Sequence, residues 1–256
     1  MNANNILHDL NPAQHDAVIH RDGPMLVVAG AGSGKTRVLT HRIAHLIQED
    51  NINPFQILAI TFTNKAAQEM KDRVAALVGP VAEKMWVSTF HSACVRILRR
   101  DAEQLGYPSA FSIYDQADAT RLTGYVVRDL GLDNKKFVAR SVHAHISNLK
   151  NELISTDTAL ERADGIFDRK VAEIYNEYQR RLRTAGAMDF DDLLTVTVEL
   201  FNNYPEALKH YQERFQHVLV DEYQDTNPAQ NDIVLKLGDR HRNVFVVGDS
   251  DQSVYA

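Results

Sequence analysis

A glycine-rich segment with the sequence AGAGSGKT occupies residues 29–36. It follows the apolar run 25–28 and precedes a stretch whose apolar residues recur at helical spacing. Between a strand and a helix, glycines let backbone N–H groups close around phosphate oxygens, and the helix N-terminus adds partial positive charge. Lys35 would then reach the β- and γ-phosphates of a nucleotide, and the Thr36 hydroxyl would bind Mg²⁺. The predicted nucleotide contacts are Gly30, Ala31, Gly32, Ser33, Gly34, Lys35 and Thr36.

Ala29 replaces the first glycine of the strict phosphate-loop pattern, but the cradle from Gly30 to Thr36 is intact. The alternative is a tight turn between strand and helix that carries an exposed lysine. The flanking strand and helix patterns favour the phosphate loop. The sequence therefore predicts a protein that binds a nucleoside triphosphate, with ATP and Mg²⁺ as its ligands.

Two acidic residues, Asp221 and Glu222, follow the wholly apolar run 218–220. Such a run predicts a central strand, and both carboxylates would stand at its carboxyl end. Asp221 could hold Mg²⁺ opposite Thr36, while Glu222 could deprotonate the water that attacks the γ-phosphorus. A spare carboxylate beside the metal suits hydrolysis better than transfer to an alcohol. The alternative is a pair of acids on a solvated turn.

Helical patterns separate most of the apolar runs, which predicts an α/β fold with a parallel sheet and right-handed crossovers. Five runs are expected to form strands: residues 25–28, 56–61, 86–89, 218–220 and 244–247. Ligands of such sheets bind beyond the carboxyl ends of the strands. Gln252 follows the fifth run and could touch the γ-phosphate through its amide. Phe62 follows the second run, at the same functional edge, although a core phenylalanine is the plainer interpretation.

Asn11 and Pro12 form a good N-cap and first-turn pair for a short helix. Gln14 would sit near the start of this helix. A glutamine amide can both donate to and accept from one adenine edge, which would select ATP over GTP. An exposed helix glutamine is the alternative.

Residues 110–186 lack the strand–helix alternation and show helical periods instead, which predicts an inserted all-helical module. A cluster of arginines, residues 180, 181 and 183, lies near the end of its last helix, where positive charge suits the helix dipole. Together with Lys135, Lys136 and Lys150, these arginines could face phosphates. A solvated helix face is the alternative for each of them.

The composition is ordinary for a globular protein, with 44% hydrophobic and 24% charged residues among 256. The single cysteine, Cys94, excludes an internal disulfide and is expected in the core. No apolar run is long enough for a membrane span or a signal peptide, so we expect a cytoplasmic protein without membrane contact. The net charge of −6 argues against a broadly basic nucleic-acid surface.

Taken together, these motifs resemble those of superfamily 1A DNA helicases of the UvrD/Rep/PcrA type. The acidic segment DEYQDT and the later GDSDQSVY are more specific than the phosphate loop, which many families share. The segments that carry the resemblance are residues 10–14, 29–36, 61–67, 88–92, 189–194, 221–226 and 248–255. They occur in the family's order, and the resemblance covers essentially the whole chain.

The resemblance implies that Gln14 reads adenine, that Arg37 lies near the nucleotide and that Gln224 couples the nucleotide and DNA sites. It also implies that residues 1–109 and 187–256 form RecA-like motor domain 1A, with helical subdomain 1B at 110–186. Such helicases close ATP between two RecA-like lobes, and the second lobe, absent from these 256 residues, supplies arginine fingers. Residues at the rim of the sheet would bind single-stranded DNA: Phe62, Asn64, His91, Phe190 and Tyr255.

The expected function is a 3′ to 5′ helicase or translocase that hydrolyses Mg–ATP, binds single-stranded and duplex DNA, and acts in repair or replication. One alternative is the front end of a RecB- or AddA-like helicase–nuclease subunit, against which the compact insert argues. Another is a non-motor P-loop ATPase. Stimulation of ATP turnover by DNA would separate the helicase classes from the last.

Overall fold

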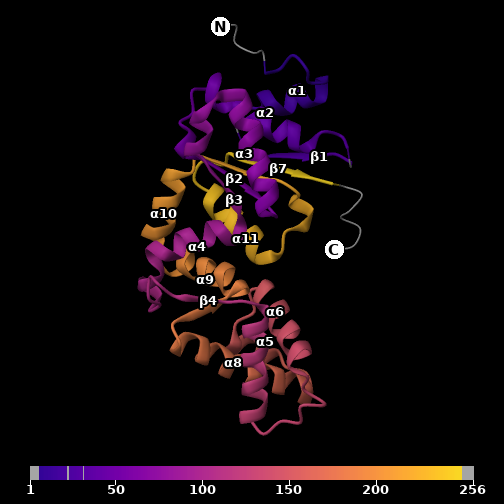
Figure 1. Cartoon of the computed structure of the whole chain (residues 1–256), viewed down its shortest axis with the longest axis vertical. Helices are drawn as coiled ribbons and strands as arrows, with labels where there is room; N and C mark the ends of the chain where they lie inside the picture. Colours follow the sequence, from indigo (N-terminus) through magenta and orange to yellow (C-terminus); the bar gives the residue numbers. More distant parts are fainter. Residues whose placement is uncertain (1–5, 22, 31, 250–256) are drawn as a thin grey trace. The chain divides into compact units, whose positions relative to one another are not determined.

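The computed structural model describes residues 6–21, 23–30 and 32–249. The predictions for Ala31, Gln252 and Tyr255 therefore lie outside the described residues. The chain divides into two compact units (Figure 1). Unit 1 comprises residues 1–93, 205–226 and 234–256, and unit 2 comprises residues 94–204 and 227–233. The assignment of domains 1A and 1B, with boundaries at 110 and 186, stays a prediction.

Unit 1 is built on a parallel sheet of five strands in the order β1-β7-β6-β2-β3. All four pairings are parallel, so the carboxyl ends of the strands share one edge. This confirms the predicted α/β fold, and each strand begins within a residue of its predicted start. The strands are β1 (Met25–Val28), β2 (Ile57–Thr61), β3 (Trp86–Thr89), β6 (His217–Val220) and β7 (Val244–Gly248).

Three helices cover one face of this sheet: α1 (Pro12–Ile19), α2 (Lys35–Gln48) and α3 (Asn64–Val78) (Figure 1). Alternate strand residues point toward them, as the period of two requires. The shared core contains Val18, Leu39, Ile43, Met70 and Val74 from the helices, and Ile57, Ala59, Val87, Leu219, Phe245 and Val247 from the strands. This burial explains why the strands read as nearly continuous apolar runs.

The other strand residues form the opposite face. Trp86 lies there with its ring 4.9 Å from that of Phe215, and both are buried. At β1 this face is open, because Leu26 and Val28 are 59% and 56% exposed. The remaining elements of unit 1 are α10 (Pro205–Arg214) and the short 3-10 helices η1 (Pro54–Gln56), η2 (Pro80–Lys84) and η4 (Tyr223–Asp225). Helix α4 (Phe90–Asp101) and helix α11 (Pro228–Gly238) each have residues in both units.

Unit 2 is mainly helical. Its core packs one side of three long helices together, and Val126, Ile146, Ile174, Tyr178 and Leu182 are buried there. The elements are α5 (Gln116–Asp129), α6 (Ala139–Asn151), α7 (Thr156–Arg162), α8 (Ile166–Thr184), α9 (Phe190–Asn203) and η3 (Ala102–Leu105). One addition to the predicted helices is the short strand β4 (Ser112–Tyr114), which pairs in parallel with β5 (Ala187–Asp189). Cys94 is buried, as expected.

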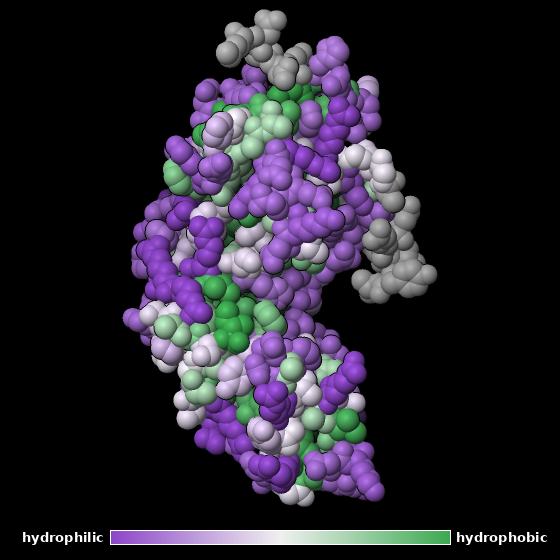
Figure 2. Space-filling model, viewed as in Figure 1, coloured by the Kyte–Doolittle hydropathy of each residue, from purple (hydrophilic) through white to green (hydrophobic). Residues whose placement is uncertain are grey.

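Hydrophilic residues predominate on the face shown in Figure 2, and apolar residues appear there in separate small groups. Within the described residues, no helix is both long and apolar enough to cross a membrane.

Candidate nucleotide site

A pocket of about 400 Å³ opens where the phosphate loop meets the carboxyl ends of β6 and β7. The parallel register pairs Val28 of β1 with Gly248 of β7, which brings the residues after both strands to the same edge. The pocket is lined by Gly32, Gly34, Lys35, Thr36, Arg37, Arg73, Glu222 and Asp249. Four of the predicted loop residues, Gly32, Gly34, Lys35 and Thr36, therefore line one cavity together with the predicted base Glu222, whereas Gly30, Ser33 and Asp221 are not among its lining residues.

Lys35 lies between two carboxylates in this pocket. Its Nζ donates to Asp249 Oδ2 at 2.9 Å and lies 3.6 Å from Glu222 Oε2. Burial disfavours the charged amine, but the hydrogen bond to Asp249 and the charge of Glu222 outweigh it and raise the pKa of Lys35. A lysine held charged among anions can exchange one anionic partner for another. The arrangement therefore suits a phosphate-binding lysine.

The turn of the phosphate loop depends on glycine at two positions. Gly32 and Gly34 have φ values of +75° and +86°, a region that glycine adopts at little cost. At Gly34 space is short as well, because an added Cβ would lie 2.8 Å from Gln14 Nε2. Gln14 donates to the Ser33 carbonyl at 2.9 Å and closes a capping box with Asn11. Gln14 thus touches the loop, and its contact with adenine stays a prediction.

The acidic pair follows β6, as predicted, and the two side chains differ in exposure. Asp221 is buried, and burial followed by the charge of Glu222 raises its pKa. The Glu222 side chain is 40% exposed and faces the pocket. Its backbone has a φ of +48°, which is uncommon for a residue with a side chain. Non-glycine residues in this region concentrate at functional sites.

The donor groups present fit a magnesium ion. Thr36 offers a hydroxyl and Asp221 a buried carboxylate, and hard divalent cations prefer oxygen ligands. In the part of the chain that the structure describes, no three His, Cys, Asp or Glu side chains converge as a ready metal site. The ion would therefore take most of its ligands from water and phosphate, as Mg²⁺ usually does.

The predicted DNA contacts within the described residues lie in both units. Phe62 and His91 follow β2 and β3, which pair in parallel up to Thr61 and Thr89, so both lie at the functional edge of unit 1. Phe62 is half-buried and meets the buried Phe90 edge-on, with 5.9 Å between ring centres. Asn64 begins α3 and is exposed, whereas Phe190 begins α9 in unit 2 and is 48% exposed. Their contacts with DNA stay predictions.

Two residues that line the pocket, Asp249 and Arg73, were not predicted from the sequence. Asp249 follows the apolar strand β7 directly, and that position could have indicated a second carboxylate beside the phosphate loop. Arg73 comes from the middle of α3, where one basic residue on a helix gives no signal by itself. Only the packing of α3 on the sheet brings this guanidinium to the cavity.

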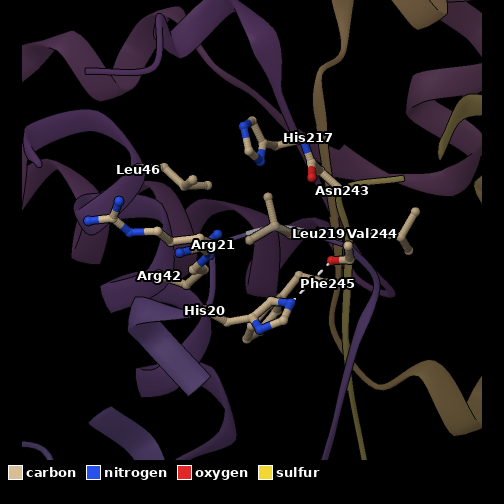
Figure 3. A pocket seen from close by; sticks show the side chains of 10 residues that line it. His20, Arg21, Arg42, Leu46, His217, Leu219, Asn243, Val244 and Phe245 are labelled. Atoms are coloured by element: carbon tan, nitrogen blue, oxygen red, sulfur yellow. Dashed lines mark hydrogen bonds between the residues drawn. The ribbon is translucent and has the colours of Figure 1, made fainter. Parts of the chain in front are cut away.

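A separate small cavity lies at the amino end of the same sheet (Figure 3). His217 and Val244, which begin β6 and β7, line it together with His20 and Arg42. His20 Nε2 lies 3.3 Å from the carbonyl oxygen of Gly23. The cavity measures about 10 Å³, room for about one water molecule. Its size and position exclude it as the nucleotide site.

A parallel sheet whose first strand runs into a phosphate loop, with an acidic pair at the end of a central strand, defines a P-loop NTPase. Within that class, the chain belongs to the UvrD/REP helicase N-terminal domain family, whose model matches residues 10–256. The fold is that of the family's RecA-like domain together with a helical region.

Two relatives are ATP-dependent DNA helicases named PcrA. The protein from Bacillus subtilis is 51% identical over 253 residues, which cover 99% of this chain and 34% of the relative. The protein from Staphylococcus aureus strain Mu50 is 51% identical over 252 residues, covering 98% of this chain and 34% of the relative. This chain is therefore homologous to the N-terminal part of PcrA and spans about a third of the length of these curated relatives.

Proposed function

We propose that the chain is the N-terminal part of an ATP-dependent DNA helicase that translocates 3′ to 5′ on single strands. It binds and hydrolyses Mg–ATP, and single-stranded and duplex DNA are its partners. The observation that carries this proposal is the convergence of Lys35, Glu222 and Asp249 at the phosphate loop. The DNA substrate is inferred from relatives that are named DNA helicases.

The chain's own groups would divide the work of hydrolysis. Lys35 would exchange its contact with Asp249 for the γ-phosphate, and loop N–H groups would hold the other phosphates. Glu222, exposed to the pocket, would take the proton of the attacking water. Thr36 and Asp221 would hold the magnesium ion, which neutralises charge on the phosphate oxygens when it is bound.

Substitution of the two central groups tests the ATPase proposal in a full-length helicase that contains this chain. Lys35→Ala removes the charge that clamps the γ-phosphate and should lower turnover by a factor of about 100 or more. Glu222→Gln keeps shape and loses the base, so ATP binding should persist while kcat falls by about 10²–10⁴. ATP affinity and single-turnover hydrolysis are the measurements.

Two exposed residues of η2 serve as matched controls. Lys84→Ala and Glu83→Gln make the same chemical changes outside the pocket, and they should leave both quantities unchanged. Parental turnover by Glu222→Gln would show that another group is the base. ATP turnover that single-stranded DNA does not stimulate would point to a non-motor P-loop ATPase instead.

A further inference from the structure

Gln224 joins the ends of two neighbouring strands of unit 1. Its side-chain Nε2 donates to Glu222 Oε2 at 2.8 Å, and its Oε1 accepts from the backbone N–H of Asp249 at 2.9 Å. Glu222 follows β6 and Asp249 follows β7. One amide thus connects the proposed base to Asp249, whose carboxylate pairs with Lys35.

The orientation of this amide is fixed by its partners. A carboxylate oxygen can only accept and a backbone N–H can only donate, so the NH₂ group must face Glu222 and the carbonyl must face Asp249. A hydrogen bond to an ionised carboxylate is also stronger than one between neutral groups. Gln224 therefore restrains the rotation of a carboxylate whose side chain is otherwise 40% exposed.

The backbone around Glu222 needs such support. Its left-handed conformation opens the η4 turn, in which the Asp225 N–H donates to the Glu222 carbonyl at 3.0 Å. That conformation is costly for a residue with a Cβ and persists only where neighbouring contacts determine it. Gln224 supplies one such contact, because it donates a hydrogen bond to the side chain of Glu222.

Gly248 makes room for the bridge. A Cβ added there would lie 3.2 Å from Gln224 Oε1 and 3.7 Å from the Gln224 backbone nitrogen. The first distance is tighter than ordinary van der Waals contact. Gly248 has no left-handed φ, so the effect of a side chain at the end of β7 would come from its contact with Gln224 and not from backbone strain.

We infer that Gln224 is a positioning residue for the proposed general base. It holds the Glu222 carboxylate toward the phosphate pocket and ties that orientation to the backbone of Asp249. The inference rests on the proposed ATPase function, but the contact itself can be tested without any turnover.

The contact is tested first in the 256-residue chain by NMR of glutamine side-chain amides. The Gln224 signal is assigned by its loss in Gln224→Met. Because that amide donates to a charged carboxylate, Glu222→Ala should shift its proton signal upfield, and the exposed control Glu83→Ala should not. A Gln224 signal that Glu222→Ala leaves in place would overturn the inference, whatever the protein catalyses.

The positioning role is tested by kinetics in a full-length helicase that contains this chain. Gln224→Met and Gly248→Ala should each lower kcat about 10-fold or more, with KM for ATP changed less than about threefold. Gln224→Glu keeps an acceptor for the Asp249 N–H but removes the donor to Glu222, so it should lower kcat similarly. Gly124→Ala, a glycine replacement in α5 at ordinary contact distance, should change neither constant.

A double-variant cycle separates positioning from a merely structural role. When Glu222→Gln has removed the base, adding Gln224→Met should lower turnover no further, because both substitutions impair the same general base. An equal further loss in that background, or a rise in KM that matches the fall in kcat, would overturn the inference. A parent enzyme without ATP turnover would instead contradict the proposed function.

Discussion

Lys150 is an ammonium group buried in unit 2, although the sequence suggested a lysine that could face phosphates. Its Nζ donates to Asp189 Oδ2 at 2.7 Å and to Asp192 Oδ1 at 2.8 Å. The Tyr178 hydroxyl also donates to Asp189, and Gln179 donates to Asp192. A buried charge is tolerated only when partners surround it in this way.

Removing this ammonium group should be strongly destabilising. Lys150→Met leaves two buried carboxylates without their cation and should lower the free energy of unfolding by about 3–5 kcal/mol. Lys136→Met makes the same change at an exposed residue and should stay within about 0.5 kcal/mol of the parent. Urea denaturation of both variants provides the measurement. Equal stability of the two variants would show that Lys150 is not needed to balance the acids.

The two carboxylates beside Lys150 respond differently to their surroundings. Burial opposes the ionisation of Asp189, but the charge of Lys150 and several hydrogen bonds outweigh it and lower the pKa. At Asp192, burial and then the charge of Asp189 outweigh the attraction of Lys150 and raise the pKa to about 6. Asp192 is therefore the first of the pair to take up a proton as the pH falls.

That raised pKa fixes the sign of a pH effect on stability. Between the unfolded pKa near 4 and the folded pKa of about 6, the folded protein holds a proton that the unfolded chain has released. The resulting stability is present at low pH and is lost as the pH rises through 6. From pH 4 to pH 7, the free energy of unfolding of the parent should fall by on the order of 2–3 kcal/mol relative to that of Asp192→Asn. Denaturation at both pH values measures this, and a change of opposite sign would refute it.

Strand β2 has a phenylalanine near each end, which gives a matched test of DNA binding. Phe62 follows the strand at the functional edge, and Phe55 precedes it and is 48% exposed. If the rim residues stack on bases, Phe62→Ala and Tyr255→Ala should each cost about 1–3 kcal/mol of single-strand affinity in a full-length helicase. DNA stimulation of the ATPase should weaken as well. Basal ATP binding should be nearly unchanged, and Phe55→Ala should alter none of these quantities.

Fluorescence anisotropy with an oligothymidine at several salt concentrations measures that affinity. Because the sequence carries a net charge of −6, few counterions should be released and the salt dependence should be shallow. A steep salt slope with no effect of either substitution would show that charge, and not stacking, binds the strand.

The strands of unit 1 could be predicted because each is buried on a parallel sheet and reads as a short apolar run between turn residues. Strand β4 could not, because its three residues Ser112–Tyr114 are only partly buried and pair with a strand about 75 positions later. The helical periods of unit 2 indicated its helices for the same local reason. Elements that depend on distant pairing leave little trace in their own sequence.

In the candidate site, too, the features that are local in sequence could be predicted and those that depend on distant packing could not. The phosphate loop and the acidic pair are local motifs, and the structure brings loop residues and Glu222 to one pocket. Arg73 and the Gln224 bridge depend on where α3 and β7 pack, so no spacing along the chain reveals them. Lys150 was misjudged for this reason as well, since its two acids lie about 40 residues away.

The 256 residues span about a third of the length of the PcrA relatives, and this limits what the chain should do alone. In helicases of the type that the motifs resemble, a second RecA-like lobe would close the pocket beside Lys35 and Glu222. An arginine finger from such a lobe typically contributes a factor of about 10³–10⁵ to turnover. The chain by itself should therefore bind Mg–ATP weakly, turn it over at least about 10³-fold more slowly than a full-length helicase containing it, and separate no DNA strands. Calorimetric ATP binding, single-turnover hydrolysis and a fluorescent strand-separation assay, run in parallel on both proteins, measure the three quantities. Rapid unwinding by residues 1–256 alone would show that this pocket is complete without a second lobe.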